Sequence, residues 1–81
     1  MDSYQRLVLI EDSNELSQEE TRHLTIISNE IGNDCFMDVD YSELGEILSI
    51  DDEDSIEELL ELGVNIGIFT YDKPSGEIIV E

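Results

Sequence analysis

The sequence predicts a small α+β domain, with about four mostly antiparallel strands and two or three helices packed on one face of the sheet. A length of 81 residues suits one domain, residues 1–81, because a core of this size cannot be divided and remain stable. Apolar residues make up 40% of the chain, which supports a folded core despite the charge. Turn and cap signals divide the chain into elements in the order β-α-β-α-α-β-β.

The first predicted strand is Tyr4–Ile10, an apolar and partly β-branched run that ends in a polar Glu-Asp-Ser-Asn cluster. The first predicted helix follows, because Ser17 and Glu20 have the spacing of a capping box. Gly32 is expected to close this helix. Its core face carries apolar residues at helical spacing: Leu24, Ile27 and Ile31. A strand at Leu24–Ser28 is the rival assignment, which the two cap signals disfavour.

The second half predicts a strand at Cys35–Val39 and a short helix from Asp40 through Leu48, capped by Asp40. A longer helix is predicted over Asp52–Leu62, with its core face at Ile56, Leu59 and Leu60 and with Gly63 as its stop. Two apolar runs on either side of Lys-Pro-Ser-Gly predict a C-terminal β-hairpin. The order of the strands in the sheet stays open.

Charge is the dominant feature of the composition. The chain has 22 Asp and Glu residues and 3 Lys and Arg residues, which gives a net charge of −19. Such a surface repels nucleic acid and anionic membranes and steers the chain toward basic partners. General adaptation to high salt would also produce an acidic surface. The chain contains no Ala and is rich in Ile, Ser and Asn, which is not the composition expected of an extreme halophile.

The acidic residues form groups along the chain. Seven carboxylates fall between Asp51 and Leu62, with no Lys or Arg among them. In a helix, Glu53, Glu57 and Glu61 form one file at i, i+4, and Asp54 and Glu58 form a second. Each like-charge neighbour destabilises a helix by about 0.2–0.5 kcal/mol. Such regular charge resembles the phosphates of a nucleic-acid strand, which advance ~3.4 Å along the axis.

A second acidic group surrounds the start of the first predicted helix, where some of its members also suit the helix dipole. A third series, Asp34, Asp38, Asp40, Glu43 and Glu46, extends the negative charge. Tyr41 and Tyr71 are candidate aromatic anchors, with core packing as the alternative for both. The predicted partner-binding residues are Asp51, Asp52, Glu53, Asp54, Glu57, Glu58, Glu61, Glu11, Asp12, Glu15, Glu19 and Tyr41.

Catalytic and metal signatures are missing from the sequence. His23 is the single histidine and is interpreted as structural, and the lone Cys35 is interpreted as a small buried hydrophobe. Asp38-Val39-Asp40 fails the calcium-loop pattern, because Glu43 stands where glycine is required. We therefore expect neither an enzyme nor a bound metal or cofactor. The N-terminus lacks a signal peptide pattern, and no apolar run reaches the ~20 residues of a membrane span, so a cytoplasmic location is expected.

The leading hypothesis is a small acidic inhibitor that imitates nucleic acid and occupies the basic cleft of a nucleic-acid-binding protein, such as a nuclease or an effector complex. Phage or mobile-element counter-defence is the expected setting, with anti-restriction, anti-CRISPR and repair-enzyme inhibition as the possible activities. The alternative is an immunity protein or antitoxin that neutralises a basic nuclease toxin through a few specific anchors. A blander alternative is an acidic interaction module of a host regulator. The chain is expected to be a monomer or a homodimer.

Overall fold

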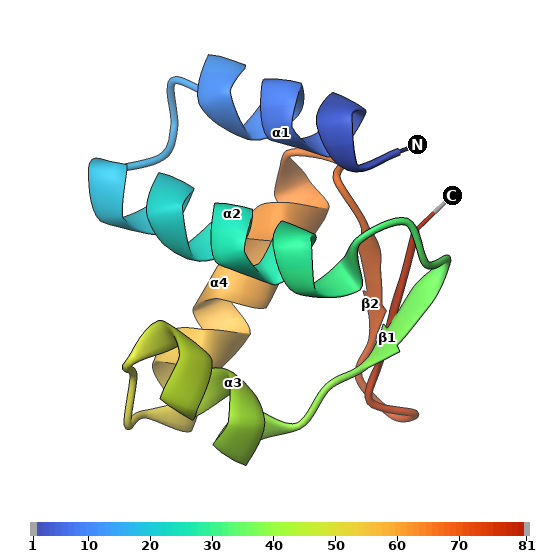
Figure 1. Ribbon diagram of the computed structural model, residues 1–81. Coiled ribbons are helices and arrows are strands. Elements are labelled where there is room, and N and C mark those ends of the chain that lie inside the picture. The colour runs from blue at the N-terminus through green and yellow to red at the C-terminus, as the bar shows by residue number, and fades with distance from the viewer. Residues whose placement is uncertain (1, 81) are drawn as a thin grey trace.

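The computed structural model describes residues 2–80. It has four helices and a three-stranded antiparallel sheet, so the predicted α+β class is confirmed at that level (Figure 1). The order is α-α-β-α-α-β-β, which differs from the prediction in its first element. The elements are α1 (Ser3–Asp12), α2 (Gln18–Ile31), β1 (Phe36–Asp38), α3 (Tyr41–Leu48), α4 (Glu53–Asn65), β2 (Thr70–Asp72) and β3 (Glu77–Ile79).

The predicted strand over Tyr4–Ile10 is wrong, because these residues lie in α1. The Asp2 carboxylate accepts from the backbone N–H of Gln5 at 2.8 Å, and the Gln5 side chain accepts from the backbone N–H of Asp2 at 2.9 Å. This reciprocal capping box satisfies two backbone donors at the start of the helix. Arg6 and Ile10 are buried one turn apart, so the run has a helical and not an alternating burial pattern.

The predicted helix after Ser17 is confirmed as α2, with the Ser17–Glu20 capping box formed in both directions. Gly32 ends it at a φ of 60°, a conformation that glycine adopts without steric penalty. The predicted core residues Leu24, Ile27 and Ile31 are all buried.

The two later helices also begin where they were predicted: α3 follows its predicted cap, Asp40, and α4 follows Asp52, the first residue of the predicted range. Asp40 accepts from the backbone N–H groups of Ser42 and Glu43, and Asp52 accepts from that of Asp54. Gly63 does not stop α4, so that part of the prediction is wrong. It lies inside the helix against the ring of Phe69, where the structure has no room for a Cβ atom.

Helix α4 ends three residues later than predicted, at Asn65. Gly67 follows with a φ of 84° and donates its N–H to the carbonyl of Val64 at 3.1 Å. A left-handed glycine just past the last turn is a common way to close a helix. Gly67 therefore has the role that the sequence assigned to Gly63.

The sheet has the order β1-β3-β2, and the predicted C-terminal hairpin is confirmed as β2 and β3. Met37 and Tyr71 flank Ile78 across the strands and face the core together with it. The helices lie on this one side of the sheet (Figure 1). The opposite face is open, and Phe36 and Ile79 pair across it as exposed neighbours.

Arg6 joins the first two helices inside the core, where its side chain has no exposed area. Its Nε donates to Ser28 Oγ at 2.9 Å, and its Nη2 donates to the carbonyls of Ser28, at 3.2 Å, and Gly32. A cation at the C-terminal end of α2 also complements the helix dipole. Burial lowers the pKa of the Arg6 guanidinium, and the nearby Asp2 carboxylate opposes that shift.

Candidate functional site

Helix α4 places its carboxylates on the side away from the core. The buried face of the helix consists of Ile56, Leu59, Leu60 and Gly63. The acidic residues lie at the positions between them and point away from the core. The residues most directly opposite the core are exposed: Asp54, Glu58 and Glu61. No ion pair within residues 2–80 involves these three carboxylates. This outward set, called here the α4 ridge, is the least compensated negative surface of the helix.

The start of α4 uses some of its carboxylates for helix stability. Asp52 accepts from the backbone N–H of Asp54 through Oδ1 and from Ser55 Oγ through Oδ2, both at 3.1 Å. Glu53 lies in the first turn, where negative charge complements the partial positive charge of the helix N-terminus. Asp51 and Asp52 lie in the exposed turn before the helix. The predicted carboxylates are therefore exposed there, although Asp52 and Glu53 also have structural roles.

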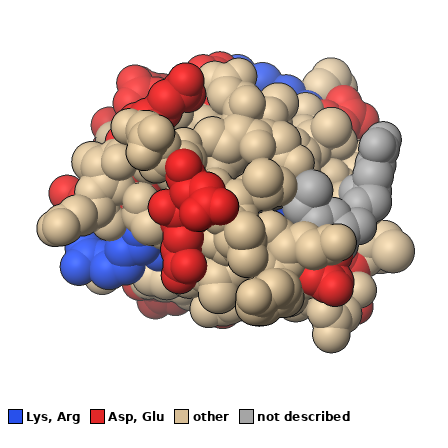
Figure 2. Space-filling view, turned by 90° about the horizontal axis from the view of Figure 1, so that it is seen from above, with Lys and Arg blue, Asp and Glu red and all other residues tan. Residues whose placement is uncertain are grey.

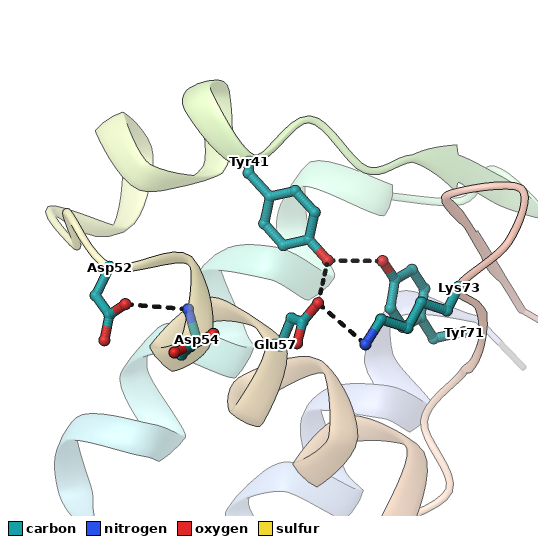
Figure 3. A network of polar contacts seen from close by, with 6 residues as sticks. All are labelled: Tyr41, Asp52, Asp54, Glu57, Tyr71 and Lys73. Carbon is teal, nitrogen blue, oxygen red and sulfur yellow. Dashed lines mark hydrogen bonds and ion pairs between the residues drawn. The ribbon is translucent and has the colours of Figure 1, made fainter.

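Glu57 differs from its neighbours because it is half-buried in a polar network that joins α3, α4 and the hairpin (Figure 3). The Tyr41 hydroxyl donates to Glu57 Oε1 at 3.3 Å and lies 2.8 Å from the Tyr71 hydroxyl. Lys73 Nζ lies 3.3 Å from the same Glu57 oxygen. Burial first, and then the hydrogen bond with Tyr71 and the charge of Glu57, raise the pKa of Tyr41 well above its ordinary value.

This network changes the interpretation of two predicted site residues. Tyr41 is half-buried and packs against the core, and its hydroxyl is already hydrogen-bonded. Glu57 is partly neutralised by Lys73. In the folded chain both side chains therefore already have polar partners. No local pattern in the sequence indicates this network, because its members lie on three separate elements.

The second predicted group lies around the α1–α2 connection. Glu11, Asp12, Glu15 and Glu19 are all exposed. Figure 2, which looks onto the side where α1 lies, shows the acidic side chains in separate groups with uncharged surface between them. On this face the negative charge is therefore not one continuous band.

One hollow joins the beginning of α2 to α4. It has a volume of about 500 Å³ and is lined by Glu19, Glu20 and His23 on one side and by Glu58, Leu59 and Leu62 on the other. Glu19 is thus brought to the α4 ridge, whereas Glu11, Asp12 and Glu15 do not line this hollow. His23 is 6% exposed, in agreement with a structural role.

A second hollow, of about 610 Å³, lies between α3 and the start of α4. Its acidic lining residues are Asp40, Glu43, Glu46, Asp51 and Glu53. From the sequence, the α3 acids are predicted to extend the negative charge, but they are not included among the predicted partner-binding residues. Their helical spacing after a capping aspartate was the signal that could have included them.

The cations do little to neutralise this surface. Lys73 pairs with Glu57, Arg6 is buried against α2, and Arg22 is exposed on α2. Cys35 is also exposed, so its interpretation as a buried residue is wrong. In the part of the chain that the structure describes, no three His, Cys, Asp or Glu side chains are grouped to hold a metal ion. No helix among residues 2–80 has the length and apolar character needed to cross a membrane.

The order of the helices around α4 bears on whether this helix can approach nucleic acid. Residues 49–52 join α3 to α4, and two successive helices joined by a short turn are the elements of a helix-turn-helix. In DNA-binding helix-turn-helix domains the second helix enters the major groove. Here α4 has that position in the chain, yet its exposed side carries the α4 ridge. Charge repulsion opposes the approach of this helix to a phosphate backbone.

No protein-family model, curated protein or solved structure matches this chain.

Proposed function

We propose that this chain is a small acidic inhibitor that binds the basic nucleic-acid-binding cleft of another protein in place of nucleic acid. The observation that carries the proposal is the α4 ridge, in which Asp54, Glu58 and Glu61 are exposed without an ion pair among residues 2–80. Neighbouring acids from α2 and α3 line hollows on either side of the helix. A basic cleft that accommodates α4 would meet negative charge from three helices.

The energetics support a binding role for these carboxylates. Like charges one turn apart destabilise a helix by about 0.2–0.5 kcal/mol per pair, and an exposed Lys at one of the positions would relieve the repulsion. A basic partner relieves the same repulsion on binding. It also gains the long-range attraction that accelerates association between oppositely charged proteins.

The spacing of the ridge supports imitation of a phosphate strand. Side chains at i and i+4 on a helix stand ~5–6 Å apart at Cβ. Phosphates of one strand advance ~3.4 Å along the DNA axis and are separated further by the helical path. Lys and Arg side chains arranged to contact successive phosphates can therefore reach successive carboxylates. Counter-defence by a phage or mobile element, with a restriction, repair or CRISPR effector as target, fits an inhibitor of this kind by analogy alone.

A second candidate function, that of an immunity protein or antitoxin for a basic nuclease, is favoured by a different observation. Tyr4 is 74% exposed on α1 and Phe36 is 58% exposed on the open face of the sheet. Exposed aromatic side chains are typical anchors of a specific protein interface. Under this alternative, Tyr4→Ala or Phe36→Ala weakens binding more than neutralisation of the α4 ridge does.

Competition with DNA tests the proposal. Proteins from an extract of the source cells are captured on the immobilised chain and eluted with rising salt. The captured protein is then titrated onto a fluorescent DNA duplex, with and without the chain. Under the proposal the chain displaces the duplex and does not itself shift it in a gel. Simultaneous binding of chain and duplex to the captured protein, or direct binding of the chain to DNA, contradicts the proposal.

A further inference from the structure

A third hollow lies between α4 and the hairpin, on the other side of the helix from α2. It has a volume of about 290 Å³. Its lining residues are Glu57, Glu61, Val64, Asn65, Tyr71 and Lys73. This hollow combines carboxylates with apolar side chains, whereas the hollow beside α3 is lined mainly by polar ones.

The lining suits a cation carried on an apolar stem. Val64, which is 38% exposed, and the Tyr71 ring supply apolar and aromatic walls. Glu61 is exposed and has no ion pair within residues 2–80. Asn65 adds a side-chain amide, which can both donate and accept a hydrogen bond. A long side chain with a positive head can therefore bury its stem and leave its charge beside the carboxylates.

The chain itself supplies an example of such an occupant. Lys73 extends from the hairpin turn and places Nζ 3.3 Å from Glu57 Oε1, next to Tyr71 (Figure 3). The Lys73 side chain lines the hollow and is 70% exposed, so most of its surface remains in solvent. Because Lys73 itself is mostly exposed and is held by one ion pair, little free energy opposes its displacement.

We propose that this hollow binds an arginine side chain of the partner protein. The guanidinium pairs with the Glu61 carboxylate and with Glu57, the stem lies along Val64, and the planar group stacks on Tyr71. Arginine is favoured over lysine because its planar fork binds carboxylates through two parallel hydrogen bonds and stacks on aromatic rings. The identity of the partner rests on the proposed function, whereas the preference for arginine is a property of the hollow.

The test uses two peptides of equal charge, acetylated tri-arginine amide and acetylated tri-lysine amide, titrated into the isotope-labelled chain. NMR follows the Val64 methyl groups, the Asn65 side-chain amide and the Tyr71 ring. Tri-arginine is expected to shift these signals to saturation and to bind about tenfold more tightly than tri-lysine. Equal affinities of the two peptides, or shifts spread evenly over the acidic surface, would overturn the proposal.

Matched variants separate the hollow from the general charge. Glu61→Gln is expected to weaken tri-arginine binding about tenfold. Glu53→Gln removes the same charge from the same helix, but Glu53 lines the hollow beside α3, so its effect is expected to be at most about twofold. Lys73→Gln is expected to strengthen binding more than Arg22→Gln, which removes an equal charge elsewhere on the surface.

If Glu61→Gln and Glu53→Gln weaken tri-arginine binding equally, the arginine site is contradicted. The proposed function still stands in that case, provided that the chain displaces DNA from its captured partner. Loss of that competition result, with the arginine preference intact, contradicts the proposed function instead. The two failures are therefore distinguishable.

Discussion

Arg6 is expected to stabilise the fold more than any other charged residue, because it is buried and bonded across two helices. We consider Arg6→Met, which keeps an apolar side chain in the core and removes the guanidinium. Three hydrogen bonds from the guanidinium to Ser28 and Gly32 are lost. Hydrogen bonds from a charged donor contribute about 1.5–3 kcal/mol each, so the gross loss from three of them is about 4.5–9 kcal/mol.

Two features of the structure reduce this gross figure. Burial of the guanidinium opposes folding by several kcal/mol, which the lowered pKa of Arg6 reflects, and the variant avoids that desolvation. The Ser28 carbonyl also keeps the N–H of Gly32 as a donor at 3.0 Å. We therefore expect Arg6→Met to lower the free energy of unfolding by about 2–4 kcal/mol. A chain of 81 residues has a total stability of about 4–12 kcal/mol, so the loss is a large part of it.

Urea unfolding followed by circular dichroism measures this change. Arg22→Met is the matched control, because Arg22 is exposed on α2 and its loss is expected to change stability by at most about 0.5 kcal/mol. A double-mutant cycle of Arg6→Met with Ser28→Ala is expected to give a coupling energy of about 0.5–3 kcal/mol. An Arg6→Met variant as stable as the Arg22 control, or a coupling energy near zero, would refute the reasoning.

Three further predictions concern charge, packing and pH. The melting temperature is expected to rise between low salt and ~0.3 M monovalent salt, because screening over ~8–10 Å relieves repulsion among carboxylates. A melting temperature that stays constant or falls as salt is added would contradict this expectation. Gly63→Ala is expected to reduce the free energy of unfolding by about 1–3 kcal/mol, because the added Cβ atom forces the Phe69 ring to move. An unchanged urea unfolding curve would show that the ring can move without loss of stability. The folded state raises the pKa of Tyr41, so its contribution is fully present below pH ~10 and is lost as the pH rises above that value. Tyr41→Phe should remove that part of the alkaline stability loss, and an identical pH profile for the variant would show that other groups cause it.

The elements with local start signals were predictable from the sequence. Ser17 and Asp40 each cap the helix predicted to follow them, and α4 begins after Asp52, where its predicted range starts. The hairpin was predictable because Lys-Pro-Ser-Gly separates two apolar runs. These signals act over a few residues, so they can be recognised without tertiary structure.

Helix α1 was predicted as a strand, because a short apolar run such as Tyr4–Ile10 fits a strand and a buried helix equally well. The Asp2–Gln5 capping pair is a local signal for this helix. The contact that fixes its buried face, Arg6 with Ser28, joins residues 22 positions apart. The role of Gly63 depends in the same way on the Phe69 ring, which no local pattern reveals.

The candidate site was predictable in its charge and not in its geometry. The exposure of Asp54, Glu58 and Glu61 follows from helical spacing against a core face. The attachment of Glu57 to Tyr41 depends on packing between residues 16 positions apart. The hollow beside the hairpin likewise depends on how β2 packs on α4.

The central claim, that the α4 ridge binds a basic partner, is tested most directly by the triple variant Asp54→Asn, Glu58→Gln and Glu61→Gln. Glu57 is left intact, because it holds Tyr41 and Lys73 in the folded chain. The control variant, Glu11→Gln, Asp12→Asn and Glu15→Gln, removes the same charge from the exposed group near α1.

Binding of both variants to the captured partner is measured by surface plasmon resonance at two salt concentrations. The ridge variant is expected to be at least as stable as the original chain, because like-charge repulsion is removed. It is also expected to associate more slowly, bind more weakly and depend less on salt than the control. Undiminished affinity of the ridge variant, or an equal loss in the control, would contradict the assignment of α4 as the binding surface.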